Sequence, residues 1–161
     1  MNDRFMNGFI AGVIANMPVL ALDMLAGVLR IDKSDYIHFV SILAYQSRNL
    51  DIGETLFAIA VQTVFAGVLG VIFNYLILYI EKRYFYSKAL IYGAILWFSI
   101  YSLDVVFKIE DVVKPNFKTA LTHCVLSLLW GFLMAFVLRF LVEKQDARDR
   151  DGLDIQDQNP L

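Results

Sequence analysis

Residues 56–80, LFAIAVQTVFAGVLGVIFNYLILYI, decide the fold class of this chain. The stretch contains no Asp, Glu, Lys or Arg, and it exceeds the roughly 20 apolar residues that a helix needs to cross the hydrocarbon core of a bilayer. It is also longer than the strands of a soluble protein, which span about 4–8 residues. We therefore predict a transmembrane helix here.

Three further runs have the same character, at residues 5–29, 89–107 and 120–142. The whole chain is 58% hydrophobic and 19% charged, against about 45–50% and 25% in soluble domains. This composition predicts an all-α fold, a polytopic transmembrane bundle of four helices. Residues 1–142 form the transmembrane domain of this prediction, and the polar, Asp-rich residues 143–161 form a disordered tail.

The first two runs are joined by a segment that contains a shorter apolar stretch, residues 36–45. It is too short to cross a bilayer, and Ser34 and Asp35 precede it as helix-capping residues. We predict a short interfacial helix here. A re-entrant segment is the alternative.

The distribution of Lys and Arg predicts the orientation, because cytoplasmic loops carry an excess of these residues. Four spans place both termini on one side, and the basic residues favour the cytoplasm for that side of the cell membrane. The terminal side holds eight of them and the other side six: Arg4, Lys82, Arg83, Lys88, Arg139, Lys144, Arg148 and Arg150, against Arg30, Lys33, Arg48, Lys108, Lys114 and Lys118.

Small residues form one stripe along three of the predicted spans. Helices in lipid associate through close backbone approach and polar contacts, and small residues permit that approach. The stripes therefore predict the packing faces, and their central members are Gly8, Gly12, Ala66, Gly70, Ser127 and Gly131.

The spans also suggest an internal duplication. When residues 8–23 are aligned with residues 89–104, five positions are identical, and Asp23 falls on Asp104. When Gly70 is aligned with Gly131, Gln62 falls on His123. These matches suggest a tandem two-helix repeat, related by an axis along the membrane normal as in parallel-repeat transporters.

No motif of a known reaction occurs in the chain. We find no HExxH, P-loop, GxSxG, CxxC or EF-hand series, and we predict no enzyme, no cofactor and no metal site. The net charge of −2 and the lack of a basic stripe argue against nucleic acid as a partner. The expected partners are the lipid bilayer and either a second copy of the chain or another membrane protein.

Polar side chains inside the spans are the candidate functional residues, because burying them in lipid is costly. Counted from the expected helix ends, Asp23, Gln62, Asp104 and His123 lie in the same leaflet. We predict that Asp23, Gln62 and His123 form one hydrogen-bonded group, with Asp104 at its rim. The alternative interpretation is that the side chains of Asp104 and His123 are hydrated by water at the membrane interface.

Three segments of the chain are similar to segments of known membrane proteins. They are the opening GFIAGVIANMP with Asp23, the stretch VLGVIFNYL and the ending THCVLSLLWGFLMAFVLRFL. In these segments the chain resembles a family of small four-helix integral membrane proteins of bacteria that has no assigned activity. The resemblance implies a membrane location and four spans, and it implies nothing about mechanism.

Two functions remain after these exclusions. The first is a non-catalytic membrane scaffold or assembly component, in which the buried polar residues hold the bundle together. The alternative is a small permease or a proton- or cation-coupled transport component, in which Asp23, Asp104 and His123 bind or relay the ion.

Overall fold

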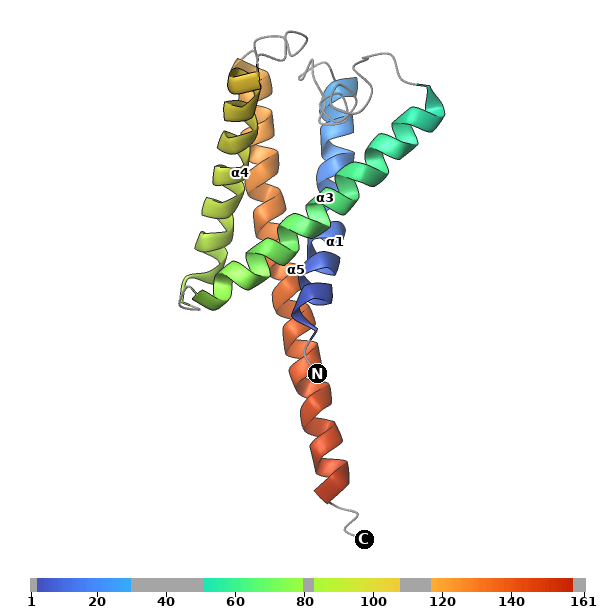
Figure 1. The fold of residues 1–161 in the computed structure, drawn as a ribbon, viewed down its shortest axis with the longest axis vertical. Coiled ribbons are helices and arrows are strands. Elements are labelled where there is room, and N and C mark those ends of the chain that lie inside the picture. Colours follow the sequence, from blue (N-terminus) through green and yellow to red (C-terminus); the bar gives the residue numbers. More distant parts are fainter. Residues whose placement is uncertain (1–2, 30–50, 80–82, 108–116, 158–161) are drawn as a thin grey trace.

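The computed structural model describes residues 3–29, 51–79, 83–107 and 117–157. Within these ranges the fold is all-α and has no strand, as predicted (Figure 1). The helices are α1 (Arg4–Val28), α3 (Ile52–Tyr79), α4 (Phe85–Phe107) and α5 (Phe117–Asp157). The predicted interfacial helix at residues 36–45 lies outside the described residues.

The helices alternate in direction, so that α1 begins and α5 ends at the same end of the bundle (Figure 1). Packing follows the order α3, α1, α5, α4: α1 packs on α3 and on α5, and α4 packs on α5. α3 crosses the other helices obliquely and meets α4 only over a short stretch (Figure 1). The bundle thus consists of two helix pairs, α1 with α3 and α4 with α5, joined mainly through α1 and α5.

Three of the helices are long and apolar enough to cross a membrane. They are Arg4–Val28, Ile52–Ile77 and Phe117–Lys144 within the described residues, and they make the fold that of a membrane-embedded helical bundle. α4 has 23 residues, which is enough to cross a bilayer. The side chains of its last four residues, 104–107, lie outside the described part of the structure.

The N-terminal turns of α1 and α3 are capped by side chains. The Asp3 carboxylate accepts a hydrogen bond from the Met6 N–H at 3.0 Å, which satisfies one of the free amides at the start of α1. Glu54 Oε2 accepts from the Asp51 N–H at 3.0 Å, as in the reaching-back half of a capping box. α3 consequently starts at Ile52, four residues before the predicted boundary of the span.

At its C-terminal end α5 continues to Asp157, well past the position at which the sequence predicts a disordered tail. Glu143 is part of the reason, because its Oε1 accepts from Arg139 Nε at 2.7 Å across one helical turn. The residues that follow include Lys, Gln, Ala and Arg, which favour helix. α5 therefore extends as a single helix beyond the start of α1 (Figure 1).

Backbones approach closely within each helix pair. A Cβ atom added to Gly12 would overlap the carbonyl oxygen of Ala66, and one added to Gly70 would overlap that of Gly8. In the second pair a Cβ added to Gly93 would overlap the Ser127 carbonyl, and one added to Gly131 would overlap that of Ala89. The stripes of small residues thus lie where α1 meets α3 and where α4 meets α5.

Candidate functional site

The candidate site is centred on Asp23, a carboxylic acid inside the bundle. Asp23 lies five residues before the end of α1 and is 0% exposed. It continues the buried face of this helix, which also includes Gly12, Asn16 and Val19. An aspartate on this face must be accommodated by other polar groups, since an isolated charge away from water is strongly destabilising.

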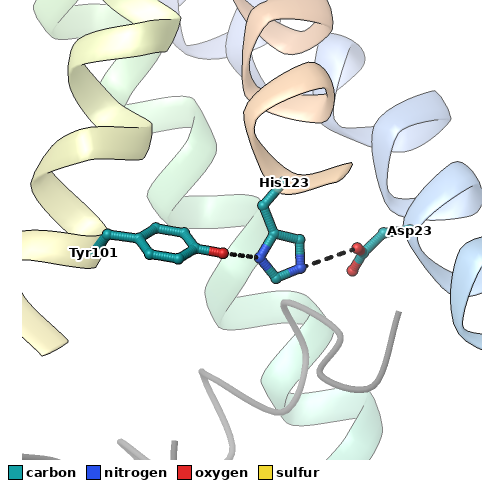
Figure 2. Close-up of polar contacts among 3 residues, drawn as sticks. All are labelled: Asp23, Tyr101 and His123. Atoms are coloured by element: carbon teal, nitrogen blue, oxygen red, sulfur yellow. Dashed lines mark hydrogen bonds and ion pairs between the residues drawn. The ribbon is translucent and has the colours of Figure 1, made fainter. Parts of the chain in front are cut away.

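His123 of α5 is the group that faces this carboxylate. Its Nε2 lies 3.9 Å from Asp23 Oδ1, and the imidazole is itself buried. On the other side of the ring, Nδ1 lies 3.1 Å from the hydroxyl oxygen of Tyr101, which belongs to α4. Figure 2 shows the three side chains in a row, with the imidazole in the middle. One polar group therefore connects α1, α5 and α4.

The depth of the group follows from the helix ends. Asp23, Tyr101 and His123 lie five or six residues from the nearest end of their helices, which corresponds to about 8–9 Å at a rise of 1.5 Å per residue. The row therefore lies near one end of the bundle, more than one helical turn inside the helix ends. Water from that side would have to enter between the helices to reach Asp23.

The geometry allows two proton arrangements. With a neutral imidazole that carries its hydrogen on Nε2, the Tyr101 hydroxyl donates to Nδ1 and the Nε2–H points towards Asp23. With a protonated imidazole, Nδ1–H donates to the tyrosine oxygen and the two charges of the Asp23–His123 pair offset each other. The separation of 3.9 Å suits an ion pair and exceeds the usual length of a direct hydrogen bond. The geometry of the row is therefore compatible with either protonation state of the imidazole.

Gln62, a further predicted member of the group, belongs to α3. Gln62 of α3 is half-buried, and among the described residues its Oε1 atom is buried without a hydrogen-bond partner. The next residue, Thr63, accepts from Asn16 Nδ2 at 3.4 Å, so this part of α3 faces a level of α1 about 10 Å below Asp23 at 1.5 Å per residue. α3 starts four residues before the apolar run, so Gln62 lies farther from the helix end than a count from residue 56 predicts. Its membership of one hydrogen-bonded group with Asp23 and His123 stays a prediction.

Asp104 lies on α4, and its side chain is outside the described part of the structure. Tyr101, which precedes Asp104 by three residues on α4, takes a central place in the row. Its ring also packs on Trp97, with centroids 5.2 Å apart. The signal that could have identified it is its position eight residues after Gly93, on the side of α4 that faces α5.

Two further polar contacts connect the helix pairs. The Tyr92 hydroxyl of α4 donates to the Leu69 carbonyl of α3 at 2.9 Å, and Trp130 Nε1 of α5 donates to the Gly12 carbonyl of α1 at 3.3 Å. Both acceptors are backbone oxygens within helices, which retain a second lone pair for such a bond. Together with the contact between Asp23 and His123, these bonds join the two pairs through side chains of the described residues.

The site offers little to a metal ion. Within the described ranges no group of three or more His, Cys, Asp or Glu side chains is close enough to hold one. Comparison of the chain with protein-family models, with curated proteins and with solved structures finds no match. The function of the chain must therefore be inferred from the geometry of the polar row and of the helix pairs.

Proposed function

We propose that the chain is a four-span protein of the cell membrane with both termini in the cytoplasm, and that it acts as a non-catalytic scaffold or assembly component. The distribution of Lys and Arg over the whole sequence supports this orientation, with eight of these residues on the side of the termini and six on the other side. An excess of basic residues marks the cytoplasmic side of a membrane protein.

We further propose that the two helix pairs are a tandem repeat. The support is the register of the close backbone contacts. Gly12 meets Ala66 as Gly93 meets Ser127, and Gly70 meets Gly8 as Gly131 meets Ala89. These are the positions that the sequence alignment pairs. α4 then crosses the membrane as the counterpart of α1.

The main support for the scaffold proposal is that the buried polar side chains form contacts between the two helix pairs. Tyr92 and Trp130 donate to backbone carbonyls of the other helix pair, and His123 faces Asp23 across the same boundary. These groups are thus engaged in joining helices, which is a structural task. α5 supplies the element for a partner, because it extends past the bundle on the cytoplasmic side of this arrangement (Figure 1).

Affinity purification from native membranes in mild detergent tests this proposal. We expect the full chain to bring a defined membrane complex or a second copy with it, and a variant truncated after Lys144 to lose that partner at an unchanged melting temperature. A full chain that purifies alone as a monomer would overturn the scaffold proposal.

A proton- or cation-coupled transport component is the second candidate. It is favoured by one observation, the fully buried Asp23 carboxyl beside an imidazole. Asp23→Asn distinguishes the two functions, because the amide can still form hydrogen bonds but cannot carry the charge. Proton uptake by wild-type protein in liposomes, abolished by Asp23→Asn at an unchanged melting temperature, supports transport. Asp51→Asn, at the same end of the bundle but exposed, is the matched control.

A further inference from the structure

Arg139 is a charged residue on the lipid-facing side of an apolar helix. It lies 22 residues after Phe117 within the apolar part of α5, and its side chain is 57% exposed. Phe136 and Phe140, on the same side, are 57% and 59% exposed. An arginine among lipid-facing phenylalanines extends its guanidinium towards the headgroup layer, while its methylene groups remain in the apolar zone.

The guanidinium of Arg139 is held in place at that level. Its Nε donates to Glu143 at 2.7 Å, and its Cζ lies 5.9 Å from the ring centroid of Tyr86, in the first turn of α4. A guanidinium has five N–H donors in a planar fork, and the bond to Glu143 uses the one on Nε. The fork is therefore oriented beside the start of α4.

A second arginine lies at the same helix start. Arg83 precedes Tyr86 by three residues, and its Cζ is 5.1 Å from the ring centroid of Tyr84. Tyr84 has a φ of 60°, a left-handed conformation that is uncommon for an aromatic residue, and it turns the chain into α4. The two arginines thus flank the first turn of α4, where free amides and the helix dipole also attract an anion.

The local charge and the surrounding surface indicate the class of ligand. Four basic residues, Arg83, Lys88, Arg139 and Lys144, lie on the described parts of α4 and α5 at this end of the bundle, with Glu143 among them. Phe132, whose ring contacts Tyr86 at 5.5 Å, is 41% exposed next to this cluster. An amphipathic anion bound at this position would place its apolar chain in contact with Phe132 and Phe136.

We propose that Arg83 and Arg139 bind the phosphate of an anionic phospholipid headgroup at the start of α4. Arginine matches phosphate with two parallel N–H donors, and the exposed phenylalanines lie where the acyl chains of that lipid would run. The proposal needs only the membrane location of the bundle. It does not depend on the scaffold function.

Lipid titration of the purified full chain tests the site. Phosphatidylglycerol and, separately, phosphatidylcholine are added to neutral detergent micelles, and bound lipid is counted by native mass spectrometry. We expect preferential retention of phosphatidylglycerol. Binding should weaken about fivefold in Arg83→Gln or Arg139→Gln and about 30-fold in the double variant, from about 1 kcal/mol for each basic residue near an anionic lipid.

Lys118→Gln, which removes a basic residue at the opposite end of the bundle, is the matched control and should bind as wild type. Arg139→Lys keeps the charge and loses the fork, so it should fall between wild type and Arg139→Gln. Unfolding in phosphatidylcholine alone shows that each variant is folded. The proposal is overturned if the double variant retains phosphatidylglycerol as wild type does, if Lys118→Gln weakens binding equally, or if inorganic phosphate displaces the lipid at equal concentration.

Discussion

Replacement of Gly12 by alanine tests the closest helix contact in the bundle. The added methyl group would overlap the Ala66 carbonyl oxygen and lie 3.0 Å from the Gly67 Cα. Both neighbours are backbone atoms, which cannot rotate away, so α1 and α3 would have to separate locally. Gly53, in the first turn of α3, is the matched control, because a Cβ there would meet nothing within 4 Å.

The expected change in the free energy of unfolding is the sum of two opposing effects. Overpacking costs about 1–3 kcal/mol, and replacing glycine by alanine in a helix gains up to about 1 kcal/mol. Gly12→Ala should therefore lose up to about 2 kcal/mol, whereas Gly53→Ala should be neutral or gain up to about 1 kcal/mol. For a chain of this size, the gap of 1–3 kcal/mol corresponds to a difference in melting temperature of roughly 3–10 °C.

Thermal unfolding of both variants in the same detergent measures this difference. Loss of the Trp130 bond to the Gly12 carbonyl, at 3.3 Å in the wild type, would add to the cost if α1 shifts. Equal melting temperatures for Gly12→Ala and Gly53→Ala would show that the backbones do not approach each other as described, and the reasoning on the helix pairs would fail with them.

Further predictions concern the repeat, the contacts between pairs and the topology. Gly93→Ala should lower the melting temperature about as much as Gly12→Ala, and a neutral effect would argue against equivalent pairs. Tyr92→Phe should lower the free energy of unfolding by about 1 kcal/mol, since the Leu69 carbonyl loses a donor at 2.9 Å; no change in denaturation would mean that this bond contributes nothing. Asp23→Leu should destabilise the protein more than Asp23→Asn, and the opposite order would exclude a structural role. Reporter fusions at residue 85 and at the C-terminus should report the cytoplasm and one at residue 112 the outside, whereas opposite compartments for the first two would refute an even number of spans.

The fold class was predictable because lipid imposes a simple rule on the sequence. Residues 56–80 have no charge over a length that only a membrane helix requires, and this alone excludes a soluble domain. The positions of Gly12 and Gly70 in the helix contacts were likewise visible, because only small residues at every fourth position allow backbones to touch.

The candidate site was less predictable from the sequence than the fold class. The depth of Gln62 depended on where α3 begins, and the apolar run does not include the polar capping turn at Asp51. The acceptors of Tyr92 and Trp130 are backbone carbonyls, which any residue could supply, so no residue type marks them. Tyr101 was hard to identify as a polar partner because a tyrosine near a helix end is also expected at a membrane interface.

The Gly12 contact has a consequence for how the bundle responds to temperature. Unfolding of a soluble protein exposes apolar surface to water, which raises the heat capacity and makes stability fall on cooling. When α1 and α3 separate in a bilayer, their surfaces meet acyl chains instead, and what is lost is van der Waals contact between the two backbones. Separation of the pair in lipid should therefore show almost no heat-capacity change, and the two helices should stay associated in the cold.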